Sequence, residues 1–164
     1  MPYRKNDVIE LYSQSKDSTI MFSIESVEIR HTTDYKTGYD CGEGCNDHIS
    51  INSHNEFIFQ IDISIRKNKI TGQSYRIEDT YFLDGNYSYS ELKNYLFENE
   101  EYDLVRIFEK TDSRGTFKKL IIAKDIGIIG LVDIHGNTWS LKPNIKRRNL
   151  NEREGIVISN VSGC

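Results

Sequence analysis

The sequence predicts an all-β, mostly antiparallel domain, sandwich-like or a partly open barrel, with one short helix. Three observations lead to this fold class. The 164 residues include ten Tyr and seven Phe but only two Pro, and aromatic and β-branched residues favour strands. Short apolar runs recur between turn signals at roughly 8–12-residue spacing. Residues 57–65 alternate apolar and polar with a period of two, as a half-buried strand does.

The segment Phe117–Leu141 is the expected centre of the fold. It contains three apolar runs separated by turn signals at 124–125 and 135–137, which predict a three-stranded antiparallel meander. The middle run is apolar on both faces, so we expect a central strand with both faces covered.

The middle run contains two glycines, which lead to a further prediction about its local structure. Alternation places Ile128 with Gly130 on one face and Ile129 with Leu131 on the other. Gly127 and Gly130 indicate either a β-bulge or a site where a backbone or an aromatic ring comes close.

The first part of the chain is expected to begin with a hairpin. Residues 7–12 and 18–30 are expected to form its strands. The alternation of apolar positions shifts by one residue between Ile24 and Val27, which predicts a β-bulge. A long polar loop is expected over 31–47. Strands then follow at 57–66 and 75–83, with a turn at 68–72 between them.

The one predicted helix begins at Ser90 and ends near Asn99. Leu92, Tyr95 and Leu96 have the i, i+3, i+4 spacing of a helix face. A strand over 102–110 returns the chain to the meander, and residues 155–158 are expected to add an edge strand. No internal repeat or linker divides the chain, so we expect a single domain, 1–164.

Composition and charge narrow the classes of function. The net charge is −4, whereas nucleic-acid binders usually have a basic domain or stripe, so no nucleic-acid partner is expected. No apolar run approaches the roughly 18 residues of a membrane span. The basic cluster Lys142, Lys146, Arg147 and Arg148 is interpreted as a solvated loop.

The loop Cys41-Gly-Glu-Gly-Cys45 is predicted to contain a disulfide, and two alternatives remain open. A local disulfide between Cys41 and Cys45 would indicate an oxidising compartment. Alternatively, these two cysteines with His48 and His54 supply the ligand types of a tetrahedral zinc site. Free thiols are the third possibility.

Enzymatic activity is not expected. The sequence contains no G-x-S-x-G, H-E-x-x-H, P-loop or G-x-G-x-x-G motif. His135 lies beside Asp133 in a turn, but no nucleophile is nearby in sequence. No cofactor is predicted.

Protein binding has more support in the composition. Tyrosine supplies rigid amphipathic contact area and is enriched at interfaces. Acidic residues are interspersed with tyrosines between 78 and 112, and such a surface suits a basic protein partner. The candidate partner-binding residues are Tyr35, Tyr39, Asp40, Glu43, Tyr87, Tyr89 and Tyr95.

The run Lys124–Leu131 with Trp139-Ser140-Leu141, and the cysteine loop before Asp47–Ile51, resemble a pattern in small secreted or lipid-anchored β-rich proteins of Bacteroidetes-type bacteria. The resemblance implies a β-rich fold and export to the periplasm or cell surface, with a leader and any lipid anchor trimmed from this chain. The leading hypothesis is an exported, non-enzymatic protein-binding module. One concrete form is an immunity protein that neutralises a co-encoded antibacterial toxin. The alternatives are a zinc-dependent protein and a carbohydrate-binding accessory domain with a flat row of exposed aromatic side chains.

Overall fold

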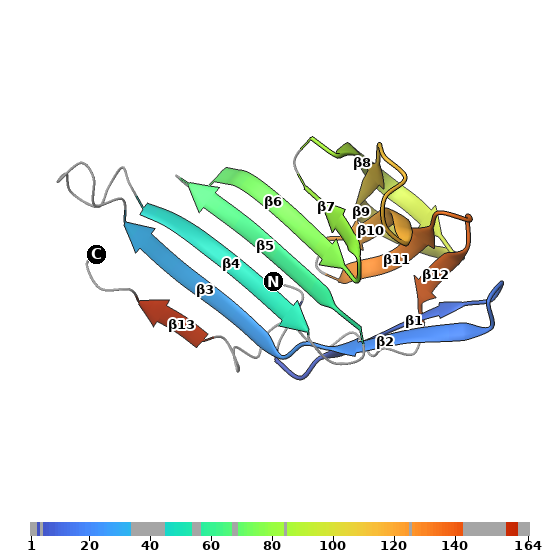
Figure 1. Cartoon of the computed structure of the whole chain (residues 1–164), viewed down its shortest axis with the longest axis horizontal. Helices are drawn as coiled ribbons and strands as arrows, with labels where there is room; N and C mark the ends of the chain where they lie inside the picture. Colours follow the sequence, from blue (N-terminus) through green and yellow to red (C-terminus); the bar gives the residue numbers. More distant parts are fainter. Residues whose placement is uncertain are drawn as a thin grey trace.

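The computed structural model describes residues 3, 5–33, 45–53, 57–66, 69–83, 85–124, 126–142 and 157–160; of 29–33, 45–53, 65–66, 69–71 and 157–160 it describes the backbone alone. Its regular elements are strands, arranged in two sheets (Figure 1). Sheet A has the order β2 (Ser18–Ser23), β1 (Val8–Ser13), β12 (Thr138–Leu141), β11 (Gly127–Asp133), β10 (Phe117–Ala123), β9 (Glu100–Lys110) and β8 (Tyr87–Phe97). Sheet B has the order β13 (Val157–Asn160), β3 (Ser26–Thr33), β4 (Cys45–Ser53), β5 (Phe59–Arg66), β6 (Lys69–Ile77) and β7 (Thr80–Phe82).

The predicted fold class is confirmed: the protein is all-β and sandwich-like, and neither sheet closes into a barrel. The pairs are antiparallel except β13 with β3, which is parallel. The predicted helix is wrong, because residues 87–97 form strand β8. The expected edge strand near the end of the chain is confirmed as β13.

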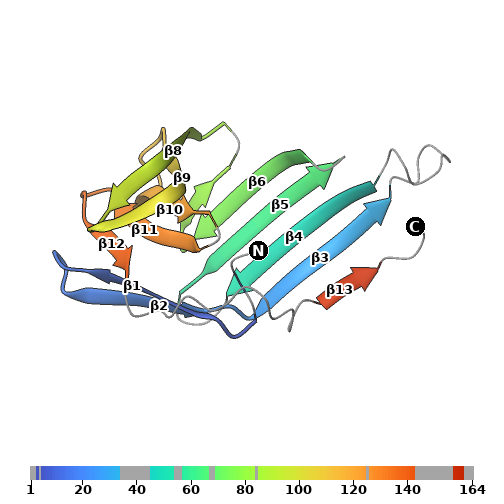
Figure 2. The ribbon, with the colours of Figure 1, turned by 180° about the vertical axis from the view of Figure 1, so that it is seen from behind.

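The two sheets pack face to face over only part of their length. Among the side chains described in sheet B, the buried ones lie at the ends of its strands that approach sheet A; they include Val27, Phe59, Ile61 and Ile77. Beyond these residues, the long strands β3 to β6 extend away from sheet A, as both views show (Figures 1 and 2). The sandwich is therefore closed at one end and open at the other.

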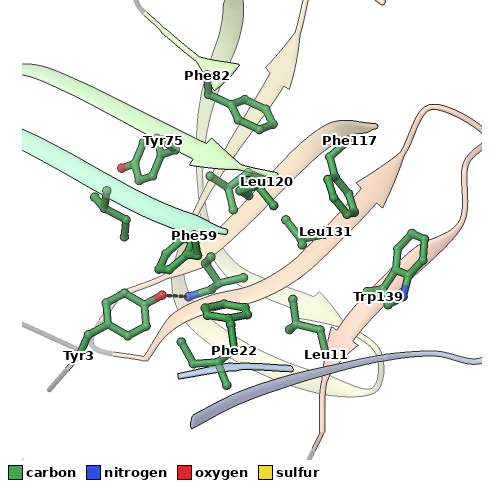
Figure 3. Packing of buried hydrophobic residues seen from close by; sticks show 14 of the residues in the cluster. Tyr3, Leu11, Phe22, Phe59, Tyr75, Phe82, Phe117, Leu120, Leu131 and Trp139 are labelled. Carbon is green, nitrogen blue, oxygen red and sulfur yellow. Dashed lines mark hydrogen bonds between the residues drawn. The ribbon is translucent and has the colours of Figure 1, made fainter. Parts of the chain in front are cut away.

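A single aromatic-rich core fills the closed end (Figure 3). Phe22 from β2 packs against Phe59 from β5, with ring centroids 4.8 Å apart. Phe108 from β9 packs against Tyr75 from β6 at 4.8 Å. Offset and tilted aromatic pairs of this kind add to the free energy gained by burying the rings, so these pairs help to hold the sheets together.

The meander is confirmed as β10, β11 and β12. β11 is buried along almost its whole length, as expected of a central strand. The bulge is also confirmed: Ile121 pairs with Gly130 but Ile122 pairs with Ile128, which leaves Ile129 as the extra residue. The predicted division of faces is wrong for the same reason. Ile128 and Leu131 both join the core between the sheets, whereas Ile129 lies in a cluster on the opposite face.

Each of the two glycines meets an aromatic side chain. A Cβ on Gly130 would lie 2.5 Å from Cζ of Phe97, and a Cβ on Gly127 would overlap the phenol of Tyr3. Gly127 also has a φ of +96°, a conformation that costs glycine little. The prediction of a close aromatic approach is confirmed at both positions.

The one-residue shift in apolar alternation after Ile24 has a different cause from the predicted β-bulge. No bulge occurs within one strand; β2 ends at Ser23, and the chain leaves sheet A to begin β3 of sheet B at Ser26. Both Ile24 and Val27 are buried. The shift of phase therefore marks the crossing between sheets.

A polar seam joins β7 of sheet B to the start of β10 of sheet A. The Thr80 hydroxyl accepts a hydrogen bond from the backbone N–H of Phe117 at 2.9 Å and donates one to Asp79 at 3.2 Å. Asp79 accepts in turn from the N–H of Thr116 at 2.9 Å. Thr80 is fully buried, and these bonds satisfy its hydroxyl.

Among the residues that the structure describes, no helix has the length and hydrophobicity needed to cross a membrane.

Candidate protein-binding surface

The β8–β9 hairpin is the most exposed part of sheet A. Its two strands pair from Tyr87 with Lys110 to Phe97 with Glu100. Glu98 and Asn99 form the turn with φ values of 48° and 67°, and two consecutive positive φ angles fit the right-handed twist of a hairpin. β8 is the edge strand of the sheet, so it is covered less than its neighbours.

The hairpin changes direction at Asn94, where φ is +51°. Before this residue, Tyr89 contacts Phe108, which belongs to the core between the sheets. After it, Tyr95 and Phe97 pack on the cluster that covers the opposite face of sheet A. The left-handed residue therefore turns the end of the hairpin over the outer face of the sheet. We call residues 94–103 the acidic hairpin tip.

A small hydrophobic cluster holds the acidic hairpin tip in place. Tyr102 is 6% exposed and packs with Val105 and Ile129. Phe97 lies over Gly130 at a distance that leaves no room for a side chain there. The tip is thus attached through its underside to the central strand of the sheet.

The outer side of the tip combines carboxylates with an exposed apolar residue. Leu96 is 67% exposed, the highest value among the large hydrophobic side chains described. Residues 94–103 contain four acidic residues and no Lys or Arg. The formal charge of residues 94–103 is therefore −4, which equals the formal net charge of the whole chain. Glu98, Glu100, Glu101 and Asp103 are all exposed. Glu101 lies directly opposite Leu96 in the hairpin, whereas Glu100 accepts a hydrogen bond from the hydroxyl of Tyr102 on the underside at 3.1 Å.

The first half of β8 carries a polar network on its inner face. The Tyr89 hydroxyl donates to Oε2 of Glu91 at 2.9 Å, and Nε of Arg106 donates to the same oxygen at 3.1 Å. These hydrogen bonds, from Tyr89 first and then Arg106, hold the pKa of the Glu91 carboxyl below its usual range. Burial, followed by the hydrogen bond to Glu91, raises the pKa of Tyr89.

The predicted partner-binding tyrosines of this region, Tyr87, Tyr89 and Tyr95, lie on the edge strand β8. Tyr89 is 47% exposed, whereas Tyr87 and Tyr95 are half-buried against Phe108 and the outer cluster respectively. Tyr102 is a core residue. Tyr89 therefore offers most contact area among the tyrosines of this hairpin.

The other candidates lie outside the described residues or are described by backbone alone. Tyr35, Tyr39, Asp40, Cys41, Glu43 and His54 are not described, and Cys45 and His48 are backbone positions on β4. Thr33 and Cys45 pair at the ends of β3 and β4, at the far end of the molecule from β8 (Figures 1 and 2). The described residues contain no group of three or more potential metal ligands. The disulfide and the zinc site both remain predictions.

The pair Asp133 and His135 belongs to a structural turn. Oδ1 of Asp133 accepts hydrogen bonds from the N–H groups of His135 and Asn137, both at 2.8 Å, and Oδ2 accepts from the Asn137 amide. Burial raises the pKa of this carboxyl, but the hydrogen bonds from Asn137 and His135 outweigh burial and leave the pKa lowered. The carboxylate is occupied in closing the β11–β12 turn.

A flat row of aromatic side chains, which the carbohydrate-binding alternative requires, is not formed by the described tyrosines. The two with the largest exposure are Tyr89 at 47% and Tyr81 at 42%. They lie on strands of different sheets, and Arg76 covers the Tyr81 ring at 5.1 Å from its centroid.

A scan against protein-family models, a search of curated proteins and a search of solved structures found no match to this chain.

Proposed function

We propose that this chain is an exported, non-enzymatic protein-binding module and that the acidic hairpin tip contacts a basic surface of its partner. The observation that carries the proposal is the exposed Leu96, which lies opposite Glu101 in a hairpin tip with four exposed acidic residues. Protein interfaces combine an apolar contact with a charged rim, and charge complementarity increases the rate of association.

The attachment of the tip supports the same function. A loop that must become ordered on binding loses affinity through conformational entropy. Phe97 and Tyr102 fasten the underside of the tip to sheet A, so Leu96 and the carboxylates are presented without that cost. Tyr87 and Tyr89 lie on the preceding part of β8 and pack on Phe108 at the inner face, so they would form a contact separate from that of the tip.

One concrete form of this function is an immunity protein that binds a co-encoded antibacterial toxin. Many toxins that act on nucleic acids or anionic surfaces carry basic clefts, and an acidic protuberance with an apolar centre suits such a cleft. Export to the periplasm or cell surface, implied by the sequence resemblance, would place the protein where an incoming toxin first arrives.

Binding to the product of the neighbouring reading frame, prepared as an inactive variant, tests the proposal. The variant E98Q/E100Q/E101Q should lower the association rate roughly tenfold at low salt, with a smaller effect at high salt. Leu96→Ala should instead increase the dissociation rate.

The matched control places the same charge change on the opposite edge of sheet A. Q14K/T19K/M21K also raises the net charge by three, at exposed positions of the β1–β2 hairpin, and should leave association nearly unchanged. Equal effects of the two triple variants would indicate a general charge effect and contradict the assignment of the tip.

A further inference from the structure

β8 has an unusual combination of length and exposure for an edge strand. The other edges are six residues in β2, four in β13 and three in β7, whereas β8 has eleven. No described strand pairs with the outer side of β8. Proteins usually limit pairing at an edge by keeping the strand short or by placing Lys, Pro or a bulge there. From Tyr87 to Leu92 the strand has none of these; Lys93 follows, and Asn94 has a φ of +51°.

The side chains around Leu92 form a self-complementary pattern. Leu92 is 38% exposed, and Glu91 and Lys93 on either side of it carry opposite charges. In an antiparallel pair related by a two-fold axis at Leu92, the two Leu92 side chains face each other. Glu91 of each copy then lies opposite Lys93 of the other, because directly opposed residues have sequence numbers with a constant sum.

We infer that β8 pairs with β8 of a second copy of this chain, antiparallel and centred on Leu92. The pairing aligns residues 91–93 of the two copies, up to the left-handed Asn94, and joins sheet A of one copy to sheet A of the other. It removes two exposed leucines from water and forms two cross-strand ion pairs. Glu91 is already held at the strand by Tyr89 and Arg106, so less side-chain entropy is lost when it meets Lys93 of the second copy.

This inference does not depend on the proposed function. Self-pairing uses the backbone edge of β8 around Leu92, whereas the proposed partner contact uses the outer side of residues 94–103. The left-handed Asn94 separates the two regions. Because the paired region is short, we expect a weak dimer whose population rises with protein concentration.

Sedimentation velocity from micromolar to millimolar concentration measures the dimer in the full chain. Glu91→Lys and Lys93→Glu each place like charges opposite one another across the two-fold axis. Each variant alone should weaken dimerisation about tenfold or more. An equimolar mixture of the two should dimerise again. One variant then carries two positive charges beside Leu92 and the other carries two negative charges, so opposite charges face each other across the mixed pair.

Two controls match the charge of these variants. Glu101→Lys changes the net charge from −4 to −2, as Glu91→Lys does, and Lys16→Glu changes it to −6, as Lys93→Glu does. Both positions are exposed and lie away from the β8 edge, so both variants should retain the wild-type dimer. Circular dichroism verifies that every variant is folded.

Three results would overturn the inference. The first is a wild-type protein that remains monomeric at millimolar concentration. The second is a mixture of Glu91→Lys and Lys93→Glu that stays monomeric, which would exclude this register. The third is a dimer that persists in Glu91→Lys alone.

Discussion

The backbone N–H of Ile128 donates a hydrogen bond to the hydroxyl oxygen of Tyr3 at 2.5 Å, 125 residues away in the sequence (Figure 3). The Tyr3 ring lies over Gly127 and meets Phe59 edge-on at 5.8 Å. The contact therefore ties the start of the chain to the central strand β11 and to sheet B. Burial raises the pKa of Tyr3 well above its usual range, so the hydroxyl stays neutral at ordinary pH.

Tyr3→Phe should destabilise the protein by about 1–3 kcal/mol, because the substitution leaves the buried N–H of Ile128 without its acceptor. Urea unfolding, followed through the emission of the single tryptophan, Trp139, measures the free energy of unfolding. Tyr12→Phe is the matched control, since the Tyr12 hydroxyl bonds Asp17 at an exposed site and its loss should change stability little. Equal stability of Tyr3→Phe and wild type would contradict this role for the hydroxyl.

Gly130→Ala should destabilise the protein by about 1–3 kcal/mol, because the added methyl group enters the space occupied by the Phe97 ring. The φ of Gly130 lies outside the left-handed region, so the steric contact is the main cause. In a Phe97→Leu background the same substitution should cost less by about 1 kcal/mol. A double-mutant cycle of urea unfolding measures this coupling, and strictly additive effects would show that Phe97 and Gly130 are independent.

The stability contributed by Asp133 should depend on pH. Its pKa is lowered in the folded protein, so its contribution is complete above the unfolded value of about 3.9 and is lost as the pH falls through the folded pKa. The difference in unfolding free energy between wild type and Asp133→Asn should be about 1 kcal/mol at neutral pH and should shrink below about pH 4. A difference between wild type and Asp133→Asn that stays the same from pH 7 down to pH 3 would contradict this role of the carboxylate.

Cys41 and Cys45 are expected to form a disulfide, and the intact mass of the unreduced protein tests this directly. A mass two hydrogens below that of the reduced chain, with Cys164 as the one reactive thiol, would support the disulfide and with it the oxidising compartment. A zinc adduct under native conditions, with all three cysteines reactive after denaturation, would favour the site of Cys41, Cys45, His48 and His54 instead.

Local patterns predict the elements whose structure depends on local sequence. The three meander strands, the bulge and the aromatic contact at Gly127 and Gly130 all follow from apolar runs, turn residues and glycines inside a strand. The alternation of side chains along a strand does not show where a bulge lies. It therefore predicts that Ile129 and Leu131 share one face of β11, whereas the structure places them on opposite faces.

The candidate surface is less predictable because its conformation depends on distant contacts. Leu92, Tyr95 and Leu96 have helical spacing, yet Leu92 and Leu96 are exposed and the strand is held by pairing with β9. The alternation of Tyr95 with Phe97 and the Glu98-Asn99 turn are the signals of a hairpin. Nothing in the local sequence shows that Asn94 turns the tip over Gly130, where Phe97 contacts a residue 33 positions away.

The pairing of β1 with β12 has a consequence for how the chain folds. Leu11 lies opposite Leu141, so sheet A is incomplete until β12 has been synthesised. Sheet B is encoded largely between these two strands and can form earlier. Structures dominated by such non-local pairs fold slowly, and the β1–β2 hairpin lacks its partner strand β12 until then. For the export that we propose, this delay would keep sheet A unassembled while the chain is moved across a membrane.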